Sequence, residues 1–408
     1  MGLHLCQLCE IAYFVTDKIP LENVLLTDYV TTDSLLPNKE GRCVAQNLPP
    51  QKCALTHYKC GDVLVANIRP YLKKIWFADR EGGASSDVLV FRAKSGHSQE
   101  FLYASLLQDS FYDYVMKGKK GSKMPRGDKA QIMRYSIPKL SLAEEACIGN
   151  IILSFCTKIN INRQINDNLE AMAKQLYDYW FVQFDFPNEE GKPYKSSGGA
   201  MVWNEKLKRE IPQGWTAAKI KDVAQTYSGG TPTSTNSEYY DGGDIPWINS
   251  GELNNPIITS TTNYITEEGL NNSSAKLYPQ DTVLVALYGA TAGKVSLLSF
   301  EACSNQAVCG VIPQNKIMTT YIRYYLSSLY EHFITLSSGS ARDNISQDTI
   351  KNTIFPIPQG KILKEFSDAV APIISKIIAN QKEMENLTKQ RDELLPLLMN
   401  GQATVNSD

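Results

Sequence analysis

Two stretches of this chain carry the same hydrophobic spacing 218 positions apart, and this duplication constrains the fold more than any other feature. In each stretch the seam residues alternate in steps of four and three, the spacing of helices that pack along a narrow stripe. The first seam contains Ile148, Ile152, Phe155, Ile159, Asn162, Asn166, Leu169, Ala173, Leu176 and Trp180, and the second runs from Phe366 to Leu398. We therefore expect two long helices, over about residues 143–184 and 361–401, packed as an antiparallel coiled coil.

Each seam has an asparagine at the same rank, Asn162 in the first and Asn380 in the second. If the helices are related by a pseudo-twofold axis, these two amides would hydrogen-bond at the axis and fix the helix register. The alternative is that each amide faces water where the seam frays, and the sequence does not decide between the two. Pro372 is expected to interrupt and kink the second helix, because its ring removes a backbone donor and clashes with the preceding turn.

Shorter segments repeat in the same order around these helices. The apolar strand Val63–Ala66 recurs 220 positions later as Val283–Ala286, and amphipathic helices are expected around Phe101 and Tyr321. A short strand ending in Ile-Pro then precedes each long helix. The pattern in each half therefore predicts a mixed α/β globule followed by a long helix. The whole chain is expected to have an α+β fold with internal pseudo-twofold symmetry. The first half has no counterpart of Gly214-Trp215, so we expect the two globules to differ at their starts.

The domain order follows from these repeats and from composition. The segment between the halves is rich in Gly, Ser, Lys and Glu, which is typical of a connector. The predicted order is a first globule (1–140), a first long helix (141–186), the connector (187–210), a second globule (211–358), a second long helix (359–401) and a tail (402–408).

The composition is that of a globular protein, and 408 residues suffice for two or three domains. No uncharged apolar run approaches the ~20 residues of a membrane span, and no signal sequence opens the chain, so we expect a cytoplasmic protein. Nine scattered cysteines indicate reduced thiols. A zinc site is conceivable at Cys6, Cys9, Cys53, His57 and Cys60, but their spacing matches no finger or ribbon, and we predict no bound metal.

A basic segment stands out against the near-neutral net charge of −2. Between Lys117 and Arg134 the chain has seven basic residues and a single acidic one, Asp128, with glycines that favour a loop. Such a loop would track a phosphate backbone by displacing condensed counterions. The plainer interpretation is a solvated charged loop. A related Gly/Ser loop with an arginine, residues 339–344, at the matching place in the second half favours DNA.

Candidate DNA contacts lie in three sets of loops. Arg is suited to bidentate contact with guanine and Asn to contact with adenine, although phosphate contact is the commoner role of basic residues. Loops at strand ends also provide variable side chains on a rigid support. The candidates are Tyr71, Lys73, Lys74, Lys119, Lys120, Lys123 and Arg126 in the first half, and Thr231, Thr233, Tyr288, Thr291, Lys294, Ser340, Arg342 and Asn344 in the second. Trp247 is expected to belong to the core.

Enzymatic motifs are missing from the sequence. Residues Gly289–Lys294 superficially suggest a phosphate-binding loop, but the glycines are too close and Val295 stands where Ser or Thr would bind magnesium. No dinucleotide-type glycine turn, nuclease spacing or His-Cys nucleophile pair is present, and the four histidines are scattered. We therefore predict a chain that catalyses no reaction and binds no cofactor.

Several segments resemble one known family. They are Tyr29–Asn38, Ile211–Trp215, Ser228–Thr233, Ile245–Ile248 and Arg391–Gly401, and with the order of two globules and two helices they make the whole chain similar to the DNA specificity subunit of type I restriction-modification systems. The resemblance implies that each globule is a target recognition domain reading one half of a bipartite double-stranded DNA site. The paired helices would set the unread spacer, and the differing loops imply an asymmetric site.

The resemblance also implies partners. Two copies of a modification subunit, an adenine-N6 methyltransferase, would dock on the helices and globules, and an ATP-dependent restriction and translocation subunit would join them. S-adenosylmethionine, ATP and magnesium would then be bound by the partners. Leu153, Tyr177, Tyr179 and Phe181 are candidate docking residues on the first helix, unless they pack on the chain's own globules. A structural adaptor and a fused DNA-modifying enzyme with unrecognised motifs remain the alternatives.

Overall fold

The computed structural model describes residues 4–121, 123–338 and 344–403, and of residues 336–338 only the backbone. The chain divides into two compact units, and each unit takes a part of both long helices. The first unit comprises Met1–Arg163 and Glu383–Asp408, and the second comprises Gln164–Lys382. This division cuts through the helices, whereas the order expected from the sequence gives each globule a helix of its own.

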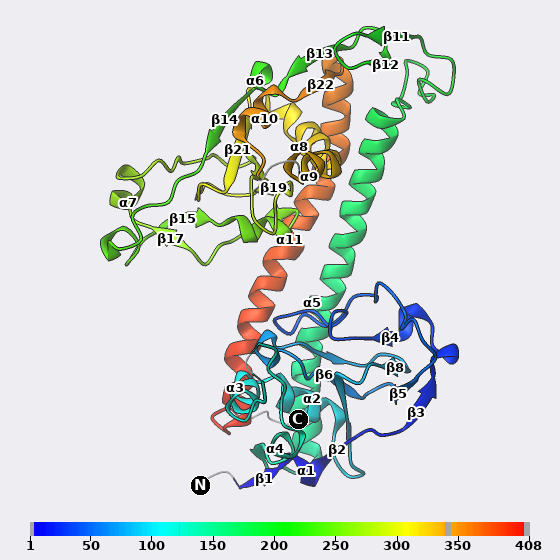
Figure 1. Cartoon of the computed structure of the whole chain (residues 1–408), viewed down its shortest axis with the longest axis vertical. Helices are drawn as coiled ribbons and strands as arrows, with labels where there is room; N and C mark the ends of the chain where they lie inside the picture. The colour runs from blue at the N-terminus through cyan, green and yellow to red at the C-terminus, as the bar shows by residue number, and fades with distance from the viewer. Residues whose placement is uncertain (1–3, 122, 339–343, 404–408) are drawn as a thin grey trace. The chain divides into compact units, whose positions relative to one another are not determined.

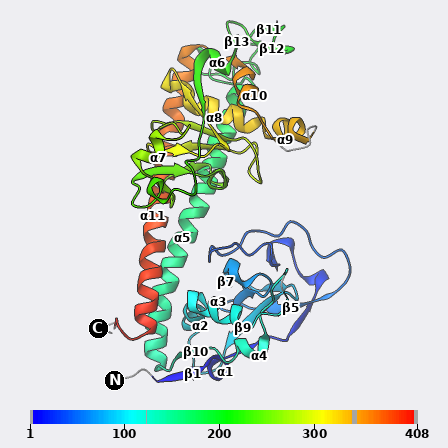
Figure 2. The ribbon, with the colours of Figure 1, turned by 60° about the vertical axis from the view of Figure 1, so that its left-hand side comes forward.

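The two long helices are α5 (Leu142–Tyr177) and α11 (Gly360–Met399). In both units their segments lie side by side and run in opposite directions (Figure 1 and Figure 2). This confirms the antiparallel pair predicted from the repeated seam. The π-helical turn Asp178–Val182 follows α5 directly. The helix α11 continues through Pro372, so the predicted interruption is wrong: the helix tolerates the one backbone hydrogen bond lost at this residue.

Buried amides in the seam have partners other than those expected. The Nδ2 of Asn380 donates to Oδ1 of Asn166 at 2.9 Å, and the Nδ2 of Asn166 donates to the carbonyl of Ile377 at 3.2 Å. In the first unit, Asn162 instead donates to Glu383 at 2.9 Å. Asn162 and Asn380 are both buried, which excludes the exposed alternative. Asn380 was expected to pair with Asn162, but it pairs with Asn166. The observed partner lies about one helical turn further along α5.

The globule of the first unit is built on two four-stranded sheets, and Figure 2 shows β7 and β9 of one of them near α2. One sheet has the order β2-β9-β6-β7 and the other β3-β5-β8-β4, while β1 and β10 form a separate antiparallel pair. The strands are β1 (Leu5–Gln7), β2 (Ala12–Phe14), β3 (Lys18–Pro20), β4 (Tyr29–Val30), β5 (Ala54–Tyr58), β6 (Val63–Ala66), β7 (Ile75–Phe77), β8 (Gly82–Ala84), β9 (Val88–Ala93) and β10 (Ser136–Pro138).

Short helices complete this globule and cover its first sheet. They are α1 (Leu8–Ile11), α2 (Gln99–Leu107), α3 (Asp109–Lys117) and α4 (Lys129–Ile132). The side chain of Ser98 caps α2 by accepting from the amide of Phe101 at 3.1 Å. Phe101 and Leu102 are fully buried, and they pack with Ile152 of α5 and Leu395 of α11 in one core. The globule is thereby fixed to both helices by apolar burial.

The second unit contains an equivalent globule. Its five-stranded sheet has the order β14-β21-β18-β19-β16, a three-stranded sheet has the order β17-β15-β20, and β13 pairs with β22. The strands are β13 (Thr216–Lys219), β14 (Ala224–Ser228), β15 (Ile245–Ile248), β16 (Ile257–Ile258), β17 (Tyr264–Ile265), β18 (Val283–Ala286), β19 (Val295–Leu298), β20 (Cys303–Ser304), β21 (Val308–Pro313) and β22 (Ile354–Ile357). Its helices are α6 (Ile220–Val223), α7 (Glu267–Asn271), α8 (Thr319–Ser328), α9 (Tyr330–Ser338) and α10 (Gln347–Asn352).

The central elements of the two globules correspond, as the repeats predicted, although the sheets differ in their number of strands. The strands β6 and β18 lie in the centres of their sheets, and all four residues of each are buried. The turns α1 and α6 are equivalent and follow β1 and β13. The globules differ before these strands, where the second has Gly214-Trp215 and the first has no counterpart. In each turn an acidic side chain accepts from the amide before the helix: Glu10 from Gln7 at 2.7 Å and Asp222 from Lys219 at 2.8 Å. These turns are only four residues long, too short for a periodic signal.

Aromatic residues join α5, the connector and the second globule into one core. Tyr177 and Phe181 are 3% and 2% exposed and pack among Tyr321 and Phe366. These two residues are therefore excluded as docking residues. The connector is ordered by the same means: Phe186 stacks on Trp215 with ring centroids 5.4 Å apart. It then continues into the hairpin of β11 (Met201–Asn204) and β12 (Arg209–Pro212).

A buried arginine fixes the second globule to α5. Arg323 of α8 is 2% exposed and its Nη2 lies 2.7 Å from Oε1 of Glu170. Burial of an unpaired guanidinium would be costly, so this contact restricts where α8 can lie on the helix. Among helices in the described part of the chain, none combines the length and apolar character that crossing a membrane would need.

The amide pair in the seam leads to a first prediction. Replacing Asn380 with Ala leaves the buried Oδ1 of Asn166 without its donor, which we expect to lower the free energy of unfolding by about 1–3 kcal/mol. Chemical denaturation followed by circular dichroism measures the change. Asn386→Ala, at an exposed position of α11, is the matched control and should change stability little. Equal effects of the two substitutions would contradict a stabilising role for the amide pair.

Candidate nucleic-acid interface

Two loops meet beyond the end of β6 in the first globule. The loop that follows β6 contains Asn67–Lys74, and the second loop joins α3 to α4. The amide of Arg69 donates to the carbonyl of Pro125 at 2.9 Å, and Ile68 and Arg126 form an isolated β-bridge. The structure therefore brings together the two sets of first-half candidates that lie about 50 residues apart in sequence.

The second of these loops closes on itself. Lys120 and Arg126 exchange two backbone hydrogen bonds of 2.8 and 2.9 Å, which hold the ends of the intervening segment together. Lys119, Lys120, Lys123 and Arg126 are all exposed. The basic run is thus presented to solvent by a closed turn rather than along a helix.

The second globule has the same meeting of loops. Tyr288 and Asn344 form an isolated β-bridge, and the amide of Ile345 donates to the carbonyl of Leu287 at 2.7 Å. Tyr288 lies two residues beyond β18, as Ile68 lies two residues beyond β6. Arg126 and Asn344 therefore occupy equivalent positions. Ser340 and Arg342 lie outside the described residues.

The third set of candidates adjoins this meeting point. The loop with Thr231 and Thr233 is exposed, and the hydroxyl of Thr231 donates to the side chain of Gln306. The next residue, Ala307, accepts from the amide of Leu287 at 2.8 Å. The indole of Trp247 donates to the carbonyl of Gly230 at 3.0 Å and supports the loop, in line with its predicted structural role.

Several candidates are buried or have partners within the fold. Thr291 is only 4% exposed, so it is excluded as a contact residue; its turn folds the side chain inward. Lys74 donates to the carbonyl of Thr32 at 2.5 Å, and partial burial lowers its pKa. The Nζ of Lys294 donates to Asn254 at 2.5 Å. Tyr71 remains half exposed, and Lys73 pairs with Asp109 at 2.8 Å.

Carboxylates hold the basic loop in its conformation. Arg126 pairs with Asp87 at 3.1 Å, and Lys120 pairs with Asp128 at 2.5 Å. Asp128 also caps α4 by accepting from the amides of Ala130 and Gln131. The Lys120 ammonium, followed by these amides, lowers the pKa of Asp128 to about 2. Asp87 was not among the sequence candidates. Only the folded structure shows that this residue, directly before β9, faces the basic loop.

The possible metal ligands do not form a site. In the described ranges no group of three or more His, Cys, Asp and Glu side chains is placed to hold a metal ion. Cys6 is buried in the core and Cys9 is exposed, and all nine cysteines are free thiols. The Lys294 side chain, at the end of the turn that begins at Gly289, donates to Asn254.

A family model supports the assignment made from these features. Residues 212–389 match the model of the type I restriction modification DNA specificity domain. This match covers the second globule and most of α11.

Curated relatives extend the similarity over nearly the whole chain. The HindI specificity subunit of Haemophilus influenzae is 28% identical, with 92% of this chain and 94% of the relative aligned. The MjaIX specificity subunit of Methanocaldococcus jannaschii is 27% identical, with 87% of this chain and 80% of the relative aligned. The crystal structure of a type I restriction-modification S subunit from M. genitalium has a TM-score of 0.59 at 13% identity, covering 98% of this chain and 96% of that one. It shows the same fold.

The anchoring of the basic loop leads to a second prediction. Because the folded-state pKa of Asp128 lies below the ordinary value of about 4, its contribution to stability is present above pH ~4 and is lost as the pH falls through about 2. NMR titration should therefore find Asp128 ionised to about pH 2. Lys120→Met should raise this pKa, while Lys123→Met, in the same exposed loop, should leave it in place. An equal response to both variants would exclude the specific ion pair.

Proposed function

We propose that this chain is the non-catalytic DNA specificity subunit of a type I restriction-modification system. It would read a bipartite, asymmetric site in double-stranded DNA, with one half-site for each globule. The observation that supports it best is the pair of equivalent loop junctions, Ile68 with Arg126 and Tyr288 with Asn344. A shared scaffold with different side chains at equivalent positions is what two readers of different sequences need. An arginine in one junction and an asparagine in the other differ in the bases they recognise best, guanine and adenine respectively.

The basic loop of the first globule would hold the phosphate backbone. Lys119, Lys120 and Lys123 are exposed on one closed turn beside Arg126. Lysines at such positions would add affinity that depends on salt, while the junction residues supply sequence preference. In the second globule, Thr231, Thr233, Tyr288 and Lys294 remain proposed contacts, as do Ser340 and Arg342 beyond the described residues.

The paired helices would set the spacer between the half-sites. The helix α5 is one uninterrupted element of 36 residues, about 54 Å long at ~1.5 Å per residue. It is therefore long compared with one turn of duplex DNA, roughly 34 Å. The buried amides of Asn162 and Asn380 would serve in register selection, each through its own partners rather than through each other.

Chemistry would be supplied by other subunits of the complex. Two copies of an adenine-N6 methyltransferase subunit and a restriction and translocation subunit would bind this chain, carrying S-adenosylmethionine, ATP and magnesium. An exposed stripe on α5 and the π-helical turn after it, formed by Ile165, Met172 and Tyr179 at intervals of seven residues, is a proposed docking surface for a methyltransferase helix. Such a partner must rotate the target base out of the duplex, so the specificity subunit must hold the flanking DNA firmly.

Methylation mapping tests this function most directly. DNA from cells expressing this chain with its cognate modification subunit should carry methyl-adenine in both halves of one gapped, asymmetric motif. Cells without the chain should lack that motif. A continuous motif, or no sequence preference in the assembled complex, would contradict the proposal and favour a structural adaptor; methylation by the purified chain alone would favour a fused enzyme.

A matched pair of variants tests the assignment of the two half-sites. Arg126→Ala should reduce discrimination at one half-site by about 1–3 kcal/mol, and Asn344→Ala should do so at the other half-site only. Binding of the assembled methyltransferase complex to duplexes mismatched in either half measures both effects. If both variants affect the same half-site, or neither does, the equivalence of the two junctions does not extend to DNA reading.

A further inference from the structure

The turn after β6 contains two residues in a backbone conformation that L-amino acids seldom adopt. Arg69 has φ 54° and ψ 62°, and Lys73 has φ 51° and ψ 47°. Both lie in the left-handed region, where a side chain crowds the following carbonyl. The structure over-determines this turn, because the amides of Leu72 and Lys73 bond back to Arg69 and Pro70 at 2.9 Å each. Strained backbone of this kind is often retained for function.

The second globule forms the same turn without the strain. The positions equivalent to Arg69 and Lys73, 220 residues later, are Gly289 and Gly293, with φ 86° and 81°. Glycine adopts these angles readily because it has no Cβ. The geometry of the turn thus calls for glycine at both positions, and the first globule has a cationic side chain at each of them instead.

One of these cations fastens the turn to the rest of the first unit. The Nζ of Lys73 and the Nζ of Lys39 both lie 2.8 Å from Oδ1 of Asp109, the first residue of α3. Partial burial alone would raise the pKa of Asp109, but the two lysines outweigh it and the pKa is lowered. The amide of Lys39 also donates to the carbonyl of Lys73 at 2.9 Å. Lys73 therefore has a structural partner.

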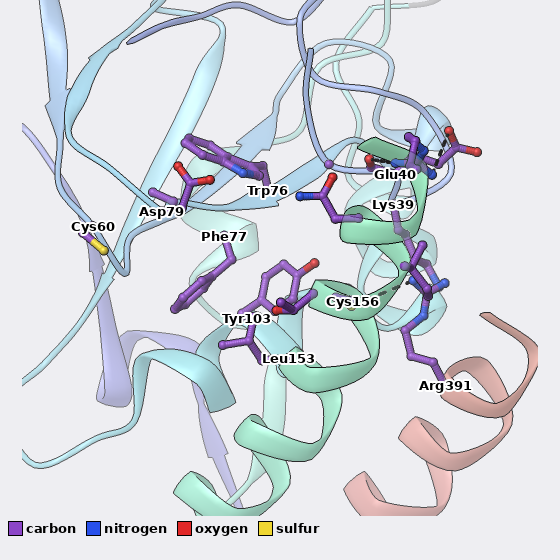
Figure 3. A pocket seen from close by; sticks show the side chains of 16 residues that line it. Lys39, Glu40, Cys60, Trp76, Phe77, Asp79, Tyr103, Leu153, Cys156 and Arg391 are labelled. Atoms are coloured by element: carbon purple, nitrogen blue, oxygen red, sulfur yellow. Dashed lines mark hydrogen bonds and ion pairs between the residues drawn. The ribbon is translucent and has the colours of Figure 1, made fainter. Parts of the chain in front are cut away.

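Further ion pairs connect Lys39 and Glu40 to the long helices. Lys39 lies 3.6 Å from Asp392 of α11, which pairs with the buried Arg391 at 2.9 Å. The neighbouring Glu40 pairs with Arg163 of α5 at 3.3 Å. Figure 3 shows Lys39, Glu40 and Arg391 at one end of a pocket of about 380 Å³ beside α5. The turn after β6 is thus tied through a chain of ion pairs to α3, α5 and α11.

The other cation has no such structural partner. Arg69 is exposed, and within the described part of the chain its guanidinium takes part in no ion pair, whereas Arg126 is paired with Asp87. Its backbone bonds to Pro125, so it lies at the junction of the two candidate loops. Arg69 thus has an exposed guanidinium on a strained turn that ion pairs hold in place. Its side chain is presented at the surface that the two loops form.

We propose that Arg69 contacts a base in the half-site read by the first globule, and that Asp109 is the positioning residue that holds its turn through Lys73 and Lys39. This inference rests on the proposed DNA-reading function of the globule. Arginine offers two parallel donors that match the acceptors of guanine in the major groove. The glycine at the equivalent place in the second globule cannot make this contact, which adds a second difference between the two half-sites.

Arg69→Gly separates a contact role from a structural one. Glycine fits the left-handed backbone, so thermal stability should be unchanged or raised. The assembled methyltransferase complex should nevertheless bind its cognate duplex about tenfold more weakly, and lose discrimination against mismatches in the first half-site only. Lys208→Gly removes an exposed lysine with φ 52° from the hairpin of the second unit and is the matched control. Cognate binding unchanged by Arg69→Gly would overturn the proposal.

The same titrations distinguish the other outcomes. An equal loss on all sequences, with a shallower salt dependence, would assign Arg69 to a phosphate and overturn base reading. If the wild-type complex shows no sequence preference in either half-site, the proposed function itself fails. Asp109→Asn should weaken first-half discrimination without adding to the effect of Arg69→Gly, and Asp109→Glu should restore part of it. Asp113→Asn, on the exposed face of α3, is its control.

Discussion

The burial of amides within the seam between α5 and α11 is the constraint on which the remaining structure depends. Apolar seams with a four-three spacing tolerate sliding by a heptad, because leucine and isoleucine pack similarly one repeat further along. Asn380 and Asn166 remove that freedom, since a shifted helix would bury both amides without partners. The strands and short helices of the second globule then pack on helix segments whose register is already fixed. Arg323 on Glu170 has the same consequence for the second globule.

The duplicated globules show how one scaffold can present different chemistry. The hydrogen-bonded frame is the same in both, from the capped turn before the first sheet strand to the bridge between the two loops. The side chains at that bridge differ in charge, size and donor pattern. Carboxylates such as Asp87 and Asp128 hold the basic loop of the first globule in the absence of DNA, so the loop would exchange protein anions for phosphate on binding.

The sequence predicts helices and strands correctly where a repeated hydrophobic pattern extends over many residues. The seams, the buried Val-Leu-Val-Ala strands and the order of elements all repeat over many residues, and the structure confirms them. The partner of Asn380 was missed because spacing defines the stripe on a helix but not the height at which two helices meet. The opening turns α1 and α6 were missed because their likeness lies in a hydrogen bond between different residue types, Glu10 in one and Asp222 in the other.

The candidate loops were predicted as separate clusters, and their junction came only from the fold. Lys74 and Thr291 show the limit of residue-type reasoning, because a lysine or threonine after a strand can equally well turn inward. The aromatic residues at the end of α5 show the same limit. A connector rich in small polar residues did not reveal that Phe186 anchors it on Trp215.

The tryptophans are divided unequally between the two units, so the units differ in their tryptophan fluorescence. Trp76 is the single indole of the first unit's sequence, while Trp180, Trp203, Trp215 and Trp247 all belong to the second. Trp76 is nearly buried in the pocket wall, with the guanidinium of Arg42 4.5 Å from its ring centre and Tyr58 edge-on at 5.7 Å. Its emission is therefore sensitive to the local field and packing beside the loop that carries Lys39. Fluorescence from this one residue reports on the first globule separately from the second.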